Sequence, residues 1–424
     1  MRRQPGDSSS LISNTLWAAG GFGLRLGVQL FYFILVARLL GPKDYGAFAA
    51  TLAIVSILFP FASWGSGNIL IKQVSRDRTL FPLYWGAALA TTLLVGTLLT
   101  AIAALVTTLL FGWERGLELA LPLALGDLIG LKLTDISAQA FQAHQRLSRT
   151  AGVWLTTSGL RLAAAASLLA LPIEPSAYNW ALLYALSGLL AGVLSAWQVN
   201  RAFGSGPLTL KPMRGAWLEG FYFASGLAAQ GAYNDIDKTL LSRLVSDEVS
   251  GTYTAAYRVL DAGFTPIKAL LYASYPKFFQ KGASGLKGAR SLALKLVPWG
   301  LAASLVAALS LAVASPLIPL LLGEKYRSAS QILVLLAPIL IFRTLHYFAA
   351  DALTGGGYQG LRTAVQAGIG GLNLLLNLWL IPLLSWRGAV ISSLISDAGL
   401  ALTLWWLLSL LARREEGDSR ERGK

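Results

Sequence analysis

The 424-residue sequence contains no cysteine, and only 13% of its residues are charged. The absence of cysteine excludes disulfides, iron–sulfur clusters and thiolate metal sites. The pattern GxxxxGK followed by Ser or Thr is also missing, so the chain is not a Walker-type ATPase. The first apolar segment, 11–37, lacks the compact core and cleavage site of a signal peptide, and Arg25 interrupts it. We therefore expect this segment to be retained as a helix.

Hydrophobic residues make up 55% of the chain, and the mean hydropathy is +0.58. Apolar runs of about 20 to 30 residues recur, and each is long enough to cross a hydrocarbon core of ~30 Å. The sequence therefore predicts an all-α integral membrane protein with twelve transmembrane helices. Their approximate spans are 11–37, 46–68, 82–111, 117–141, 150–171, 178–200, 218–241, 250–275, 291–322, 329–350, 361–384 and 388–412.

The net charge of +14 follows the predicted topology. With the N-terminus in the cytoplasm, the inside segments hold 20 of the 35 Lys and Arg residues, the outer loops 7 and the spans 8. This asymmetry is the positive-inside signal of a multi-pass protein whose two termini are cytoplasmic. It accounts for the basic excess, and no nucleic-acid recognition motif accompanies it, so we expect no nucleic-acid partner.

A polar turn between two apolar segments occurs twice, 205 residues apart. Arg38-Leu39 precedes Gly46 in the first copy, and Arg243-Leu244 precedes Gly251 in the second. Such a turn can also arise by chance between helices. The two copies nevertheless close the first and the seventh predicted helix, which indicates two six-helix units of the same orientation, as in transporters built from parallel repeats.

One segment stands out as the boundary between these units. Residues 202–216 are rich in Gly, Pro and basic residues, whereas the other connections are short. We therefore predict an N-terminal lobe over 1–206 with helices 1 to 6, and a C-terminal lobe over 207–424 with helices 7 to 12.

Fifteen charged residues lie within the predicted spans, and exposing all of them to lipid at ~3 kcal/mol each would exceed the stability of a typical fold. They must face protein or water. Several lie near the helix midpoints, which predicts a hydrated central cavity. These midpoint residues are Arg25, Asp127, Arg161, Asp261 and Asp397.

Polar side chains also form a stripe on the first helix of each half. The stripes consist of Arg25, Gln29 and Tyr32, and of Gln230, Asn234 and Asp237. Each stripe follows an i, i+4, i+7 spacing, which places its members on one helix face. By contrast, the third, sixth, ninth and eleventh segments are much poorer in charge and are expected to face lipid.

Some charges have a simpler interpretation. Neutralised i, i+3 pairs can hold a helix bundle together without binding a ligand. The candidate pairs are Lys132 with Asp135, Asp235 with Lys238, and Arg258 with Asp261. Arg25 and Arg161 have no acidic residue within their own helical turn. Since a guanidinium presents a planar fork suited to phosphate, these two are candidate ligand-binding residues.

Two stretches carry a family resemblance. Residues 14–77, with "ARLLG" and "YG" at the first turn, and residues 234–261, with "GTYTAAYR", resemble the two half-starts of bacterial polysaccharide-biosynthesis flippases. These form the oligosaccharidyl-lipid branch of the multidrug/oligosaccharidyl-lipid/polysaccharide exporter superfamily. The helix count and the two predicted lobes extend the resemblance over the chain.

The resemblance implies a V-shaped, two-lobed transporter of the bacterial cytoplasmic membrane. It would move undecaprenyl-pyrophosphate-linked oligosaccharide outward by alternating access, for lipopolysaccharide O-antigen or exopolysaccharide. A polymerase and chain-length machinery are the implied protein partners. By position, Arg25 and Arg258 match cavity arginines of related flippases, and Asp237 matches the acid of the seventh helix.

The resulting hypothesis is a flippase without a cofactor, driven by a coupling ion, proton or sodium. Membrane lipids and the lipid-linked glycan are its expected partners. The pyrophosphate is assigned to Arg25, Arg161 and Arg258, and the sugar to Gln29, Tyr32, Gln230 and Asn234. The acids that orient these bases or bind the coupling ion are Asp127, Asp237 and Asp261.

Three alternatives remain. A drug/cation antiporter of the same superfamily predicts a net acidic cavity with a bare carboxylate, whereas the charges within the spans here sum to +1. A membrane glycosyltransferase or polymerase on the same lipid carrier predicts a long outer loop with a catalytic residue. A structural member of an export complex predicts that neutralising the cavity charges leaves export intact.

Overall fold

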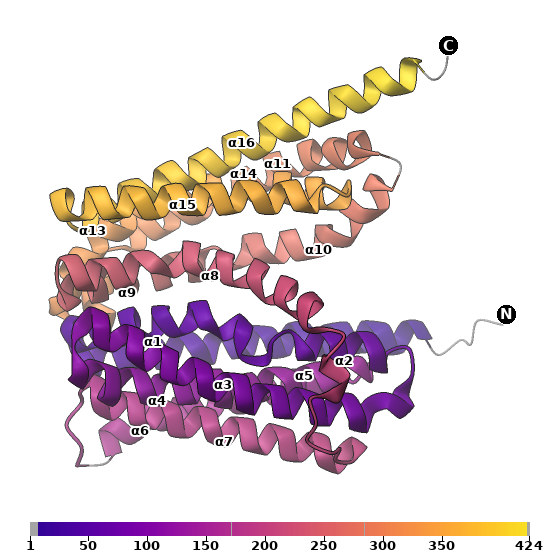
Figure 1. Cartoon of the computed structure of the whole chain (residues 1–424). Coiled ribbons are helices and arrows are strands. Elements are labelled where there is room, and N and C mark those ends of the chain that lie inside the picture. The colour runs from indigo at the N-terminus through magenta and orange to yellow at the C-terminus, as the bar shows by residue number, and fades with distance from the viewer. Residues whose placement is uncertain (1–6, 171, 284, 422–424) are drawn as a thin grey trace. The chain divides into compact units, whose positions relative to one another are not determined.

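The computed structural model describes residues 7–170, 172–283 and 285–421, without the side chains of 7–26, 229–234, 416–421 and a few single positions. Within these residues the chain consists of helices and contains no strand (Figure 1). The all-α class predicted from the sequence is confirmed. A membrane fold requires this, because lipid offers no hydrogen-bonding partner to an open backbone.

The helices follow one another with short connections. Up to the loop at residue 204 they are α1 (Asp7–Leu58), η1 (Phe59–Ser63), α2 (Ser66–Val74), η2 (Arg78–Leu80), α3 (Phe81–Phe111), η3 (Arg115–Ala120), α4 (Leu121–Ala124), η4 (Leu125–Leu131), α5 (Lys132–Ala143), α6 (Leu147–Ala170) and α7 (Ala177–Phe203). After it come η5 (Lys211–Met213), α8 (Trp217–Leu244), α9 (Asp247–Gly263), α10 (Thr265–Gly282), α11 (Leu286–Ala314), α12 (Leu317–Leu322), η6 (Glu324–Tyr326), α13 (Arg327–Leu336), α14 (Ile339–Gly355), α15 (Gln359–Leu384) and α16 (Trp386–Glu421).

Local sequence sets several helix boundaries. Gly41 has a φ of 71° and precedes Pro42, so α1 is interrupted between the first two predicted spans. Ser176 and Ser246 lie just before α7 and α9 in extended conformation, and each accepts a hydrogen bond from a backbone N–H of the first turn. These are the N-cap interactions that begin a helix at a serine.

All twelve predicted spans coincide with helices, but they differ in hydropathy. Among the described residues, seven helices are long and apolar enough to cross a membrane, or eight if α13 and α14, bent by 47°, form one span with η6. One of the seven, Gly27–Val74, covers the end of the first predicted span and all of the second. The predicted spans outside this set, 117–141, 218–241 and 250–275, are those that carry several charged residues.

The described chain divides into two compact units. One comprises Met1–Leu40 and Ala47–Asp235, and the other comprises Gly41–Gly46 and Ile236–Lys424. In the first unit α7 packs on α5, α6 and η4, and in the second α14 packs between α11 and α16. This division falls within α8, whereas the predicted lobe boundary lies in the loop before it, so lobes 1–206 and 207–424 stay a prediction.

Large apolar side chains are exposed along particular helices. In the described part they cover α3 (Leu94, Leu98, Leu105, Leu109), α7 (Leu182, Leu186, Val193), α11 (Trp299, Val306, Val313) and α15 (Leu375, Trp379, Leu383). These helices contain the four charge-poor segments predicted to face lipid. An aqueous surface seldom carries such continuous apolar area, so the pattern fits a bilayer as the solvent.

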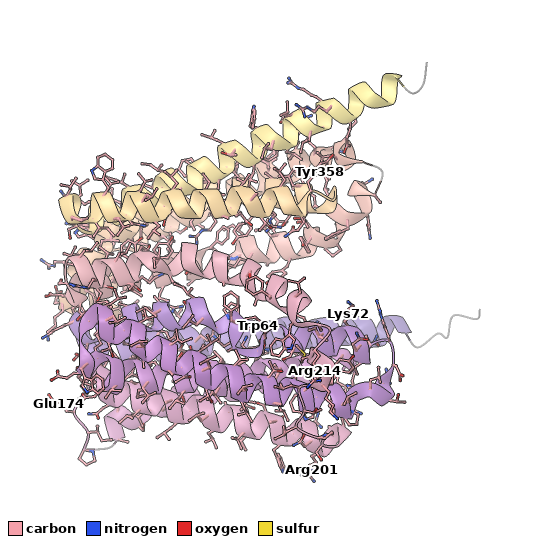
Figure 2. All side chains as sticks on the ribbon, in the orientation of Figure 1. Trp64, Lys72, Glu174, Arg201, Arg214 and Tyr358 are labelled. Carbon is pink, nitrogen blue, oxygen red and sulfur yellow. The ribbon has the colours of Figure 1, made fainter. Side chains whose placement is uncertain are left out.

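The first part of α8 is anchored to the first unit by aromatic side chains. Trp64, with a φ of 47°, donates from Nε1 to the carbonyl oxygen of Trp217 at 3.0 Å. The ring of Trp64, which is labelled in Figure 2, also contacts Phe61 and Phe221, with centroids 6.1 and 5.8 Å away. These contacts fix the end of the 204–216 loop that leads into α8.

Candidate functional site: buried charges in each unit

The first unit holds a buried ion pair between two helices. Nη2 of Arg161, on α6, donates to Oδ1 of Asp127, on η4, at 2.9 Å. The hydroxyl of Tyr184, on α7, donates to the other carboxylate oxygen at 3.1 Å, and the Arg161 guanidinium lies 3.0 Å from the centroid of the Tyr184 ring. Arg161 and Asp127 are 5% and 7% exposed. Both oxygens of Asp127 are therefore occupied.

The backbone around Asp127 is unusual and closely packed. Asp127 lies in η4, a π-helical segment, and such segments often occur at functional sites because they shift a side chain out of the regular helical position. Gly126 and Gly130 face Ala185, Gly188 and Gly192 of α7, where an added Cβ at Gly126 would lie 2.8 Å from Cα of Ala185. This small-residue contact brings η4 and α7 together and so places Asp127 beside Tyr184.

Arg161 retains a donor that the pair does not use. Its Nη1 is buried and has no hydrogen-bond partner among the described residues. Tyr32, on α1, is close enough to interact with Arg161 electrostatically and is partly exposed. A guanidinium fixed by one carboxylate and one ring, with a spare N–H beside a phenol, can donate a hydrogen bond to an anionic oxygen without moving.

A second pair in this unit is local. Nζ of Lys132 lies 3.1 Å from Oδ2 of Asp135, the i, i+3 pair predicted from the sequence. The same ammonium lies 3.6 Å from the centroid of the Phe59 ring. Since the Asp135 carboxylate neutralises Lys132 and the Phe59 ring adds a cation–π contact, this pair fits the structural interpretation.

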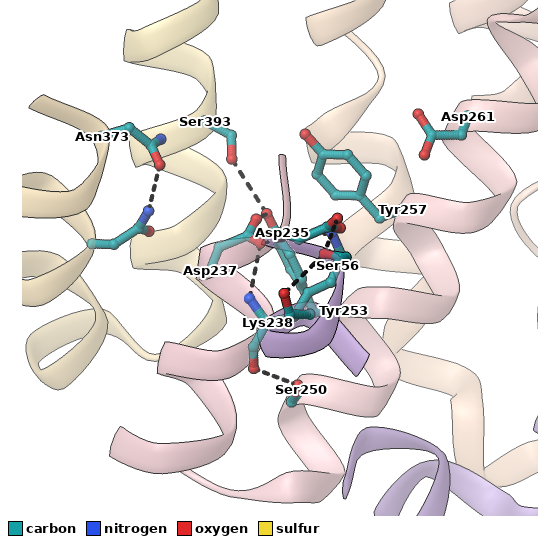
Figure 3. A network of polar contacts seen from close by, with 12 residues as sticks. Ser56, Asp235, Asp237, Lys238, Ser250, Tyr253, Tyr257, Asp261, Asn373 and Ser393 are labelled. Carbon is teal, nitrogen blue, oxygen red and sulfur yellow. Dashed lines mark hydrogen bonds and ion pairs between the residues drawn. The ribbon is translucent and has the colours of Figure 1, made fainter. Parts of the chain in front are cut away.

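The second unit contains a larger polar network, part of which is drawn in Figure 3. The hydroxyl of Tyr253, on α9, donates to Oδ2 of Asp237 at 2.7 Å and lies 3.3 Å from Oγ of Ser393, on α16. Nζ of Lys238 lies 3.8 Å from Oδ1 of Asp237. Asp237 is therefore a buried acid with a phenol and an ammonium as partners.

The network continues at Arg343 of α14. Its Nη1 donates to Oδ1 of Asp261 at 3.0 Å, and its Nη2 donates to the hydroxyl of Tyr257 at 2.9 Å. Its Nε lies 4.0 Å from Oδ1 of Asp397, on α16, and Nε2 of His346 lies 3.0 Å from the same oxygen. Arg343 thus lies between two carboxylates from two different helices.

The structure tests only some of the predicted contacts. Arg161 and Asp127 meet, and Tyr32 lies near them, while Gln29 is partly exposed on the same helix. Asp237 and Asp261 are in the second network, and Arg258 has an exposed side chain. The side chains of Arg25, Gln230 and Asn234 lie outside the described residues. The ligand roles of all ten stay predictions.

Sequence analysis counted Asp397, of α16, among the midpoint charges but assigned no residue of α14 or α16 to the cargo or to the coupling ion. Arg343, His346 and Tyr347 follow an i, i+3, i+4 spacing, which places them on one face of the helix. This spacing was the sequence signal by which Arg343 and His346 could have been found. Asp397 lies near the middle of its span. Their partnership depends on α14 packing against α16, which no local pattern encodes.

Comparison with known proteins adds a family and a fold. Residues 11–281 match the family described as "Polysaccharide biosynthesis protein". No curated protein matches the chain. Among solved structures it resembles the lipid II flippase MurJ in an inward closed conformation, with a TM-score of 0.76, 12% identity, and coverage of 93% of this chain and 87% of that one.

Two further structures share the fold. An inward-facing multidrug resistance MATE family transporter of the MOP superfamily gives a TM-score of 0.73 at 16% identity, covering 92% of this chain and 96% of that one. A MOP superfamily transporter from Pyrococcus furiosus gives 0.63 at 15% identity, covering 94% and 96%. At such identities the likeness concerns the fold, which is that of multi-pass membrane transporters.

Proposed function

Because the chain belongs to the polysaccharide biosynthesis protein family, we propose that it is a flippase for undecaprenyl-pyrophosphate-linked oligosaccharide. It is a multi-pass membrane protein with a transporter fold, and the proposal adds the cargo and the direction, from the cytoplasmic to the outer leaflet by alternating access. We assign it to the bacterial cytoplasmic membrane with both termini inside. A polysaccharide polymerase and chain-length machinery are the proposed partners.

The observation that carries the proposal is the buried Arg161, whose Nη1 has no hydrogen-bond partner among the residues that the structure describes. A buried donor without an acceptor costs about 1–3 kcal/mol, so the site is stabilised when an acceptor arrives. A pyrophosphate oxygen is such an acceptor, and it carries the charge that a guanidinium binds best. Asp127 and Tyr184 hold the guanidinium in place, so little side-chain entropy is lost on binding.

The remaining candidates complete this assignment. Arg25 and Arg258 are proposed to bind the pyrophosphate together with Arg161. Gln29, Tyr32, Gln230 and Asn234 are proposed to contact sugar hydroxyls, since amides and phenols both donate and accept hydrogen bonds. Asp127, Asp237 and Asp261 are proposed to orient the bases or to respond to a coupling ion, proton or sodium.

The rival functions are less well supported. A drug/cation antiporter requires a carboxylate open to its cargo, whereas both oxygens of Asp127 already accept hydrogen bonds from Arg161 and Tyr184. A glycosyltransferase or polymerase on the same carrier is at odds with the family and with the transporter fold. We therefore propose a transporter and not an enzyme.

The test is restoration of surface polysaccharide in cells whose own flippase is deleted. We expect the wild type to restore export and Arg161→Lys to reduce it roughly 10- to 100-fold, because hydrogen bonds to charged groups contribute about 1.5–3 kcal/mol and lysine lacks the planar fork. The matched control is Arg201→Lys, at an exposed arginine that lies over the Trp197 ring at the end of α7. Full export by Arg161→Lys would refute the site, and no export by the wild type would refute the cargo.

A further inference from the structure

Helix α10 of the second unit exposes a face unlike those of the lipid-facing helices. The helix is 18 residues long but is not among those apolar enough to cross a membrane. Its large exposed apolar side chains are all aromatic, namely Tyr272, Tyr275 and Phe279, which are 74%, 37% and 46% exposed. The exposed apolar side chains of α3, α7, α11 and α15 are instead mostly leucine and valine. Lipid is therefore a poor match for the exposed face of α10.

The aromatic residues of α10 form a stripe together with a lysine. Lys268, Tyr272, Tyr275 and Phe279 follow an i, i+4, i+7, i+11 spacing, which places all four on one helix face. At 1.5 Å per residue the stripe is about 16 Å long. The rings of Tyr275 and Phe279 meet edge to face, with centroids 5.1 Å apart. The stripe is thus a continuous surface that is longer than any single aromatic side chain.

An aromatic belt at the membrane–water interface is the simplest alternative for this stripe. Toward the middle of a span such a belt gives way to aliphatic side chains. Here the exposed side chains toward the middle of the predicted span 250–275 are Lys268, which lies fourteen residues before the end of α10 at Gly282, and Arg258 of α9. Between them lies Asp261, whose side chain is 40% exposed. The surface stays polar with depth, as a surface that faces water does.

The groups on this surface match a carbohydrate. The C–H groups on one side of a sugar ring are weakly positive and pack against the negative face of an aromatic ring. Tyrosine adds a hydroxyl that donates and accepts hydrogen bonds, as sugar hydroxyls do. α10 also carries three lysines and no acidic residue, a charge that complements a glycan attached to pyrophosphate.

From these observations we propose that the stripe on α10 is the surface that binds the glycan of the cargo. Tyr272 and Tyr275 stack on sugar rings, Phe279 extends the stacking surface, and Lys268 donates hydrogen bonds to sugar or phosphate oxygens. Arg258, proposed above to bind the pyrophosphate, precedes the stripe along the chain, so the second unit would hold both parts of the cargo. This inference rests on the proposed flippase function and adds α10 to its sugar site.

The first test measures whether water reaches the stripe. The chain has no cysteine, so Lys268→Cys carries a single thiol. The matched control is Trp299→Cys, at a 73% exposed residue of α11 thirteen positions after its start at Leu286. Since residues 283–285 alone connect α10 to α11, the two positions lie at similar depth.

The assay is the rate at which a charged methanethiosulfonate reagent modifies the two proteins in nanodiscs. We expect the Lys268→Cys protein to react about 10-fold faster or more, because a thiol in lipid neither ionises nor meets a charged reagent. Equal rates would show that the stripe faces lipid like the exposed face of α11, and would overturn the proposal.

The second test separates stacking from other roles of the rings. In the export assay, at normal protein abundance, we expect Tyr272→Leu/Tyr275→Leu to export roughly 5- to 100-fold less than the wild type, because two ring contacts are lost. Tyr272→Phe/Tyr275→Phe keeps the rings and should retain most of the export. Trp299→Leu removes an exposed ring from a lipid-facing helix and should export like the wild type.

The outcomes distinguish this inference from the flippase proposal. Equal export by the leucine and phenylalanine double variants, in a strain where the wild type restores export, would overturn the glycan surface and leave the flippase proposal standing. If the wild type itself restores no export, the flippase proposal fails, and the glycan surface fails with it.

Discussion

The Asp127–Arg161 pair allows a structural role to be separated from a ligand role. Arg161→Met leaves a buried carboxylate whose remaining partner is the Tyr184 hydroxyl. Removing one member of a buried pair typically costs about 3–5 kcal/mol, because the other charge stays buried without compensation. We therefore expect a clear loss of thermal stability in this single variant.

Removing the whole pair should have a different outcome. In Asp127→Leu/Arg161→Met neither charge of the pair remains, and replacing a buried ion pair by apolar residues of similar volume is often neutral or stabilising by about 1–4 kcal/mol. Tyr184 would then lack an acceptor, at a cost of about 1–3 kcal/mol. Adding Tyr184→Phe removes this penalty, so we expect the triple variant to approach or exceed the stability of the wild type.

The assay compares unfolding midpoints of wild type, single and triple variants in detergent, followed by size-exclusion chromatography. The same three proteins are tested for polysaccharide export. We expect the triple variant to be folded and inactive, because its apolar site cannot bind pyrophosphate. A triple variant as unstable as the single one would refute the electrostatic reasoning, and a stable triple variant with full export would show that the pair only holds the helices together.

Two further predictions concern the framework of the site. Gly126→Ala should lower the unfolding midpoint because the new Cβ would lie 2.8 Å from Cα of Ala185. The control is Gly159→Ala, where the space around the new Cβ is open and stability should rise by about 0.5–1 kcal/mol. Equal midpoints of the two variants would contradict the close helix contact. Tyr253→Phe removes the donor 2.7 Å from Asp237 and should cost about 1.5–3 kcal/mol in the same assay, and the conservative Tyr272→Phe, at an exposed tyrosine of α10, serves as its control; a loss no larger than that of the control would argue against a buried hydrogen bond.

Much of the fold follows from local sequence. Continuous apolar runs predict helices because a backbone in lipid must satisfy its hydrogen bonds within its own segment. The four charge-poor segments carry exposed apolar side chains, as predicted, and the family resemblance read from two turn motifs agrees with the match over residues 11–281. The pair Lys132–Asp135 was also predictable, since i, i+3 neighbours share one helix face.

The partners of the other buried charges could not be read from spacing. Asp235 accepts a hydrogen bond from Ser56, and Lys238 lies 3.8 Å from its neighbour Asp237, two contacts that the i, i+3 spacing does not predict. Asp261 pairs with Arg343, which lies 82 residues further along the chain. Spacing fixes only the face on which a side chain lies, and the packed neighbour of that face supplies the partner.

By itself the sequence determined that this protein is helical and membrane-embedded and that its charges are too costly to face lipid. Tertiary structure alone decided that Arg161 meets Asp127 across two helices and that His346 meets Asp397 across two others. The physical reason is the range of the forces involved. Backbone hydrogen bonding and hydropathy act within a segment, whereas a buried ion pair requires two distant segments whose small residues allow their backbones to approach.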